Sequence, residues 1–166
     1  MSNIWGQGHN HEWRAAEIRK IKEESKKELY KLDDFSFFIA GIMMYWAEGS
    51  KTRGVSITNS DERIILFMLK WFEKIFNIDI KKRIQIHLHI HDINKDQIIK
   101  KYWSKLTKIP MSNFGKSFVK PKGTGHRKNI LPNGIIRIRV YGEGIEDMRH
   151  KIMSWAEKIY ELSLDK

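Results

Sequence analysis

The chain of 166 residues contains no cysteine, which excludes a disulfide framework and any metal site built on thiolates. Its longest apolar run, residues 35–47, is shorter than the roughly 20 residues that a helix needs to cross a bilayer. The N-terminal sequence MSNIWGQGHNHEWR does not place a basic segment before an apolar one, as a signal peptide does. These absences predict a cytoplasmic protein that does not enter a membrane.

Acidic residues are missing from Gln97 to Gly142, although the whole chain contains 20 of them. The eleven cations in this segment equal the formal net charge of the chain, +11. They are Lys100, Lys101, Lys105, Lys108, Lys116, Lys120, Lys122, Arg127, Lys128, Arg137 and Arg139. A positive field concentrated in one region is typical of proteins that bind a polyphosphate partner. The other interpretation of the pattern is a solvated basic face without a partner.

The apolar pattern, with six Trp and eight Phe, predicts one folded α+β domain over residues 34–166. Residues 1–33 are dense in charge and predict an N-terminal charged helical segment or linker. The expected helices are 35–48, 60–76, one that Asn94 opens and Pro110 stops, and 145–162. The expected strands are 55–58, 83–91, 114–120 and 136–141, the last two as a hairpin. We expect Asn59 to cap the second helix.

In two of the expected strands, 83–91 and 136–141, apolar and polar residues alternate strictly. This pattern predicts a mostly antiparallel sheet with one buried face and one solvent-exposed, wet face. Arg and Gln can hydrogen-bond base edges in pairs, and Lys can hold phosphates, so the wet face predicts a nucleic-acid surface. The candidate binding residues there and in the basic segment are Arg83, Gln85, His87, His89, Lys116, Lys120, Lys122, Arg127, Lys128, Arg137 and Arg139. A zinc site at His87, His89 and His91 is an alternative for the same strand.

The helix that ends in Glu48 carries a stripe of small residues on an otherwise bulky surface. The stripe consists of Ala40, Gly41, Met44 and Ala47, followed by Glu48 itself. Such a stripe lets a second helix approach closely, and we expect a homodimer in which two Glu48 carboxylates meet. Mg²⁺ or another divalent cation removes their repulsion, so Glu48 is the candidate metal ligand and catalytic acid. Lys51 is the candidate catalytic cation beside it.

The order of these segments carries a family resemblance. IAGIMMYWAEGS, then GVSITNS, SDERIILFMLKWF and FVKPKGTGHRKN, resembles the stand-alone, single-motif members of the LAGLIDADG homing-endonuclease group over roughly residues 34–160. The resemblance implies a saddle-like sheet lying on DNA, a dimer made by the motif helix, and Mg²⁺ held by the acid that matches Glu48. It also implies a nuclease, that is, a hydrolase of phosphodiester bonds in double-stranded DNA.

Two other functions remain open on the same residues. The segments also resemble a bacterial sporulation-regulator group, in which a LAGLIDADG domain binds DNA without cleaving it. An RNA-binding protein is the third possibility, because Phe114, Phe118 and Tyr141 can stack on unpaired bases. All three functions predict binding that weakens steeply with salt.

Overall fold

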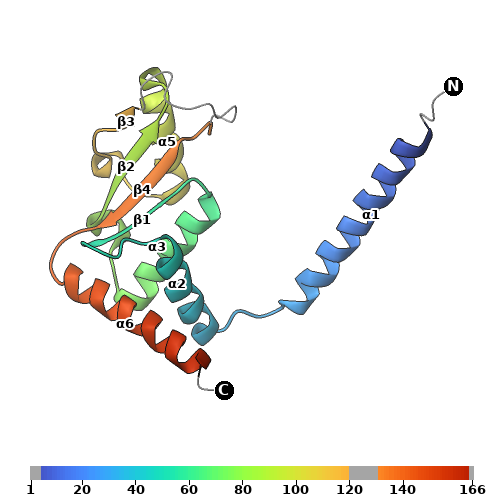
Figure 1. Ribbon diagram of the computed structural model, residues 1–166. Coiled ribbons are helices and arrows are strands. Elements are labelled where there is room, and N and C mark those ends of the chain that lie inside the picture. The colour runs from blue at the N-terminus through green and yellow to red at the C-terminus, as the bar shows by residue number, and fades with distance from the viewer. Residues whose placement is uncertain (1–4, 120–130, 165–166) are drawn as a thin grey trace. The chain divides into compact units, whose positions relative to one another are not determined.

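A computed structural model describes residues 5–119 and 131–164, the side chains of residues 5–10 and of Asn94 excepted. The chain divides into two compact units, Met1–Ser36 and Phe37–Lys166, and each is described by itself. The first unit contains α1 (Trp5–Glu28), whose side chains from residue 11 onward are exposed or half-buried (Figure 1). Surface ion pairs such as Arg14 to Glu17 line this helix and stabilise it little.

The second unit is built from five α-helices, two short 3-10 helices and one sheet within the described residues. The α-helices are α2 (Asp34–Glu48), α3 (Glu62–Phe76), α4 (Ile80–Arg83), α5 (Asp96–Thr107) and α6 (Ile145–Leu164). The 3-10 helices are η1 (Ile93–Lys95) and η2 (Met111–Asn113). The strands are β1 (Val55–Asn59), β2 (Ile84–Ile90), β3 (Phe118–Val119) and β4 (Ile135–Val140). This content confirms the α+β class that the sequence predicted.

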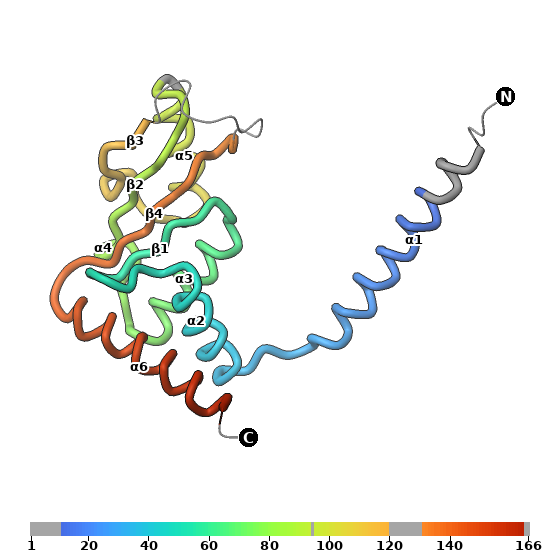
Figure 2. Tube along the Cα trace, viewed as in Figure 1, coloured from blue at the N-terminus to red at the C-terminus, as the bar shows by residue number. Residues whose placement is uncertain are grey.

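The four strands lie side by side in the order β1, β4, β2, β3 (Figures 1 and 2). β4 is antiparallel to both β1 and β2, whereas β2 and β3 are parallel. The sheet is therefore mixed, which corrects the expectation of a mostly antiparallel sheet. The reason is that α5 connects β2 to β3. The connection carries the chain back to the end of the sheet where β2 began, so β3 runs in the same direction as β2.

The alternation in β2 and β4 divides the sheet into a covered and an uncovered face. Ile84, Ile86 and Leu88 of β2 have no exposed surface, and neither do Ile136 and Ile138 of β4. α3 and α6 contact β1, and aromatic side chains of α3 and α5 join the same core. Burial of an apolar side chain contributes roughly 1.5–3 kcal/mol, so this layer holds the helices on one side of the sheet. The intervening polar residues remain on the other side.

Two boundaries differ from those expected from the sequence. Helix α3 is capped by Asp61, whose side chain accepts the Arg63 N–H, whereas the Asn59 side chain accepts the Asp61 N–H just before the helix. Of the segment expected as the strand 114–120, the structure describes residues 114–119; among these, strand β3 consists of Phe118 and Val119, and β3 pairs with β2 and not as a hairpin with β4. The earlier part of the segment is held differently, because Gly115 N–H donates to Ile86 O at 2.8 Å and brings the chain alongside β2.

None of the helices in the described residues is long and apolar enough to span a membrane.

Candidate nucleic-acid interface

Two rows of polar side chains cross the uncovered side of the sheet, and we call this side the open face. In the first row Arg139 of β4 pairs with Ser56 of β1 and Gln85 of β2. In the second row Arg137 pairs with Thr58 and His87. Arg137, Arg139, Gln85 and Thr58 are exposed, and His87 is half-buried. The tertiary structure thus brings two guanidinium groups together with hydrogen-bonding side chains from three strands.

The two arginines differ in their own partners. Arg137 donates to Ser56 Oγ at 3.2 Å, which fixes its guanidinium over β1. Within the described parts of the chain, the Arg139 side chain makes no hydrogen bond or ion pair. Arg139 is therefore free to bind an anion without breaking an internal contact.

Arg83 does not lie on the open face, where the alternation of polar and apolar residues predicted it. It is the last residue of α4, and its side chain donates to Tyr141 O at 3.0 Å and to Glu143 O at 2.7 Å. These two bonds hold the chain between β4 and α6. The structure therefore gives Arg83 a structural contact, and it does not join the rows on the open face.

The histidines of β2 are partly covered by the segment that leads to β3. A Cβ added at Gly115 would lie 2.5 Å from His87 Cε1, so only glycine lets the backbone pass this close to the imidazole. The His89 and Phe118 rings are stacked, with centroids 5.0 Å apart and planes at 19°. Phe118 is 57% exposed, so an aromatic surface adjoins the basic rows.

The remaining sequence candidates are spread more widely. Lys116 is exposed and belongs to the segment beside His87. Lys120, Lys122, Arg127 and Lys128 lie outside the described residues. Of the aromatic candidates, Phe114 packs against the core, and Tyr141 uses its hydroxyl to donate to Lys82 O.

Glu48 is the last residue of α2, and its carboxylate is exposed. Its Oε2 accepts from Asn59 Nδ2 at 3.3 Å, and Gly49 pairs with Ile57 on the free edge of β1. The end of α2 thus lies against the edge of the sheet, and the Glu48 carboxylate is held at the last residue of β1.

Lys51 follows in the loop after α2, and its ammonium donates to Ala47 O at 3.2 Å. It thereby satisfies a carbonyl at the end of the helix, where a cation is favourable. A carboxylate at the same end is unfavourable because the helix dipole is negative there. Glu48 is therefore a residue that helix stability alone does not explain.

The candidate dimer residues on α2 do not share one face. Gly41 is buried, and a Cβ there would lie 2.0 Å from the Trp71 indole, so its small size serves the contact with α3 in the same chain. Ala40 and Met44 are half-buried, and Ala47 is exposed. Together with Met43, which is 41% exposed, they form the side of α2 that remains accessible. Gly41 is thus corrected from an interface residue to a core residue.

Sequence reasoning missed the contacts that hold the loop between Glu48 and β1. Glu146 Oε1 accepts the Gly54 N–H at 2.8 Å, and Arg149 donates to Lys51 O at 3.0 Å. Arg149 also donates to Glu146 Oε2 at 2.9 Å. The hydrogen bonds from Arg149 and from Gly54 hold the pKa of Glu146 below its ordinary value. The spacing of Glu146 and Arg149 on a helix was visible in the sequence, but their partners are more than ninety residues away.

Among the side chains that the structure describes, no group of three or more His, Asp or Glu is arranged to hold a metal ion. One chain therefore offers a cation the Glu48 carboxylate and the neighbouring Asn59 amide. Mg²⁺ needs only one or two carboxylates when waters and phosphate oxygens complete its shell.

Comparisons with family models, with curated proteins and with solved structures gave no match.

Proposed function

We propose that this protein binds double-stranded DNA through the open face of its sheet. The observation that carries the proposal is the pair of rows in which Arg137 and Arg139 stand between polar side chains of β1 and β2. Arginine can bind guanine edges or phosphates in bidentate fashion, and glutamine can bind adenine. Alternate residues of a strand are about 6.8 Å apart, which matches two base steps of about 3.4 Å.

We further propose that the DNA-binding form is a homodimer that hydrolyses phosphodiester bonds with Mg²⁺. The accessible side of α2 supports a dimer, because a second copy could pack against Met43 and Ala47 near the end of the helix that carries Glu48. The placement of Glu48 at the unfavourable end of the helix dipole supports a role other than stability. A divalent ion bound there would neutralise charge on a phosphate and activate water. This proposal agrees with the LAGLIDADG resemblance.

The chain's own residues have separate parts in this scheme. Glu48 would hold the ion, and Asn59 would orient the carboxylate through the hydrogen bond that it already makes. Lys51 would first have to leave Ala47 O to reach a phosphate, so we assign it neutralisation of charge and not proton transfer. Arg137, which pairs with Thr58 next to Asn59, would fix the DNA strand next to the bond that is cleaved.

Glu48→Gln tests cleavage separately from binding. The wild type is expected to nick plasmid DNA with Mg²⁺ but not with a chelator, and the variant is expected to bind duplex DNA equally well without nicking it. If neither protein nicks DNA and both bind it, the non-cleaving regulator is correct. If single-stranded RNA displaces duplex DNA from the wild type, the exposed Phe118 favours the RNA-binding alternative instead.

Arg137→Ala with Arg139→Ala tests the binding surface itself. The double variant is expected to lose most of its affinity for duplex DNA, because two cations leave the centre of the open face. Lys105→Ala is the matched control: Lys105 is exposed on the opposite side of α5 from the buried Trp103, and should retain affinity. Equal affinity in the double variant and the control would refute binding by this face.

A further inference from the structure

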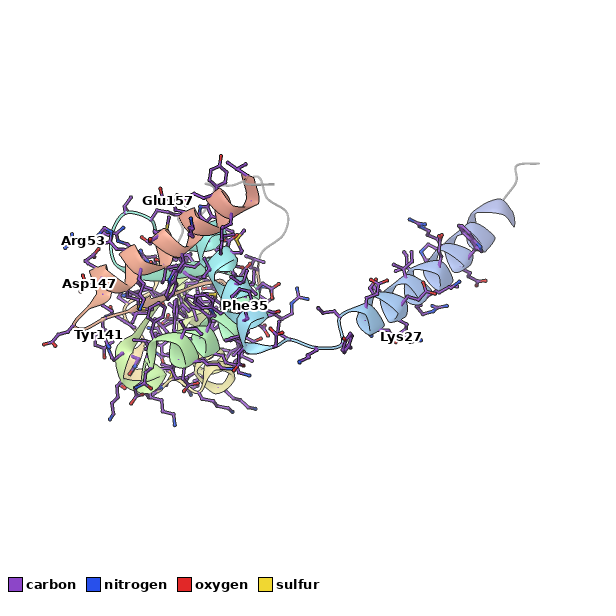
Figure 3. The ribbon with its side chains drawn as sticks, turned by 90° about the horizontal axis from the view of Figure 1, so that it is seen from below. Lys27, Phe35, Arg53, Tyr141, Asp147 and Glu157 are labelled. Carbon is purple, nitrogen blue, oxygen red and sulfur yellow. The ribbon has the colours of Figure 1, made fainter. Side chains whose placement is uncertain are left out.

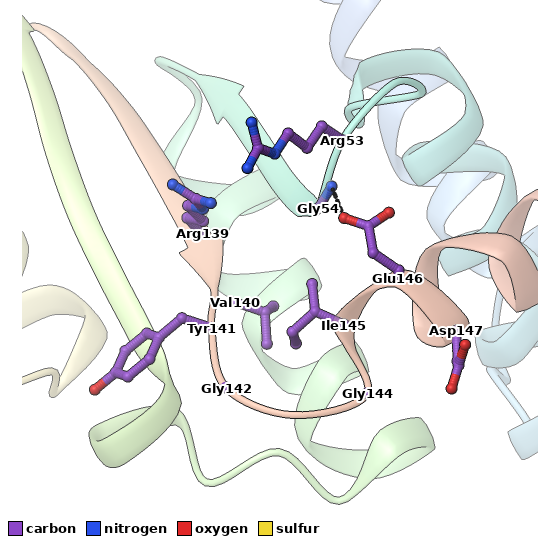
Figure 4. A pocket seen from close by; sticks show the side chains of 10 residues that line it. All are labelled: Arg53, Gly54, Arg139, Val140, Tyr141, Gly142, Gly144, Ile145, Glu146 and Asp147. Atoms are coloured by element: carbon purple, nitrogen blue, oxygen red, sulfur yellow. Dashed lines mark hydrogen bonds between the residues drawn. The ribbon is translucent and has the colours of Figure 1, made fainter.

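A cleft of about 440 Å³ opens at the end of β1 and β4 that is farther from Glu48 (Figure 4). Arg53 and Gly54 line it from the loop before β1, and residues 139–142 line it from the end of β4. Residues 144–147, at the start of α6, close the third side. Figure 3 shows Arg53, Asp147 and Tyr141 along one side of the second unit.

Two guanidinium groups converge at this cleft. Figure 4 shows the Arg53 side chain extending toward Arg139 from the neighbouring chain segment. Among the residues that the structure describes, neither guanidinium has a hydrogen bond or an ion pair. Two like charges held near each other without a counter-ion repel, and an anion between them would remove the repulsion.

The acidic groups at the cleft do not serve as that anion. The Glu146 carboxylate is already bound by Gly54 N–H and by Arg149. Figure 4 shows the Asp147 side chain across the cleft, directed away from the two arginines. Glu146 and Arg149 instead fix the loop, since they bind Gly54 and Lys51 on both sides of Arg53. The Arg53 backbone is therefore held in place before any ligand arrives.

We propose that Arg53 and Arg139 form a binding site for one backbone phosphate of the DNA strand that crosses the open face. This inference rests on the proposed function and adds Arg53, which lies outside the strands, to the interface. Guanidinium groups bind phosphate oxygens in bidentate fashion, and two of them complement one phosphodiester. Arg53 precedes Asn59, the partner of Glu48, by six positions, which is as much as about 20 Å of extended chain. The phosphate bound here is therefore distinct from the one that is cleaved, and the site positions the duplex.

The test is a salt titration of duplex binding, measured by fluorescence anisotropy with an end-labelled duplex of mixed sequence. The slope of log K against log salt becomes shallower by about 0.9 for each phosphate that the protein no longer neutralises. Arg53→Ala alone leaves Arg139 on the same phosphate, so this variant is expected to lower the affinity while keeping most of the slope. Loss of both arginines is expected to reduce the slope by about 0.9, which makes the decrease in affinity between about 50 and 200 mM salt roughly 3.5-fold smaller than in the wild type. Arg53→Lys should restore only part of the affinity, because an ammonium lacks the bidentate geometry.

The double variant of Arg53 and Arg139 tests whether both residues bind the same phosphate. Its slope is expected to fall by about 0.9 in all, because one phosphate is no longer neutralised, whereas two separate phosphates would lower it by about 1.8. Lys105→Ala is the matched control and should keep the wild-type slope. Thermal unfolding of Arg53→Ala should match that of the wild type, since the Arg53 side chain makes no hydrogen bond or ion pair in the described residues.

The outcomes separate this inference from the proposed function. If the wild type binds duplex DNA and the variant that lacks both Arg53 and Arg139 keeps the wild-type slope, the phosphate site is refuted while DNA binding stands. If the wild type binds no duplex DNA, both proposals fall. A fall of about 1.8 in the double variant would also overturn the single shared phosphate.

Discussion

A methyl group added at Gly41 would lie 2.0 Å from Cδ1 and Nε1 of Trp71 and 2.3 Å from Cε2. These distances are far inside the 3.5–4.0 Å at which carbon atoms make favourable contact. Trp71 has no exposed surface, and its Nε1 donates to Phe38 O at 3.1 Å. Its ring also packs edgewise against Phe72 and Phe76. Gly41→Ala therefore forces either the indole or α2 to move.

The expected loss of stability follows from three contributions. Overpacking of a core costs about 1–3 kcal/mol, and a buried polar group that loses its partner costs about 1–3 kcal/mol. Alanine favours the helix over glycine by about 1 kcal/mol, which acts in the opposite direction. The free energy of unfolding should therefore fall by about 3 kcal/mol. For a chain of this size the melting temperature should fall by roughly 6–12 °C.

Urea denaturation followed by far-UV circular dichroism measures this change. Trp71→Phe completes a double-mutant cycle with Gly41→Ala, because the smaller ring leaves space for the added methyl group. Gly41→Ala should cost less in the Trp71→Phe background than in the wild type. Equal stability of Gly41→Ala and wild type, or strict additivity of the two changes, would refute the packing argument.

The same variant separates the core role of Gly41 from a role in dimerisation. Because Gly41 is buried within its own chain, the dimerisation constant of folded Gly41→Ala, measured by analytical ultracentrifugation, should equal that of the wild type. Met43→Glu puts a charge on the accessible side of α2 and should weaken the dimer. A weaker dimer in Gly41→Ala together with an unchanged dimerisation constant in Met43→Glu would instead assign Gly41 to the dimer interface.

Three further predictions concern titratable groups. Glu48→Gln should melt no lower than the wild type in differential scanning calorimetry, because removing a carboxylate from the C-terminal end of α2 relieves its conflict with the helix dipole; a clearly lower melting temperature would contradict this. Glu146→Gln should be less stable than the wild type at neutral pH, because Arg149 and Gly54 stabilise the ionised carboxylate, and urea denaturation should show the difference disappearing as the pH falls from 4.5 through the lowered pKa. Burial raises the pKa of Tyr45 from 10.0 to about 12, so the unfolded chain releases this proton first and wild-type stability should decline above pH 10; the decline should be smaller in Tyr45→Phe, and identical pH profiles would refute the assignment.

Local patterns in the sequence were sufficient for much of the fold. The strict alternation around Ile84 and Ile138 predicted which side of each strand would be buried, because side chains of a strand point alternately to opposite faces. Apolar residues spaced three and four apart predicted a helix from Ile145 to Leu162. Helix α6 begins at Ile145 and ends two residues later than predicted, at Leu164. The cap of α3 was misplaced from Asp61 to Asn59, because both side chains accept backbone N–H groups within the same turn.

Contacts between distant segments decided the rest. The parallel pairing of β2 with β3 depends on the α5 crossover, and no local pattern contains that information. The alternation of the sequence assigns Arg83 to the open face, yet its side chain donates to the Tyr141 and Glu143 carbonyls and does not lie on that face. Arg53 carries no motif, and the pairing of β1 with β4, with α6 holding the loop before β1, brings it beside Arg139.

The sequence by itself determined where the charge lies, which residues alternate, and that a carboxylate ends α2. Only the tertiary structure decided that Gly41 packs against Trp71, that the Glu48 carboxylate is bound by Asn59 of β1, and that two arginines share one cleft. The physical reason is that periodicity and helix capping act within a few residues, whereas packing and sheet register join residues that are far apart in the chain.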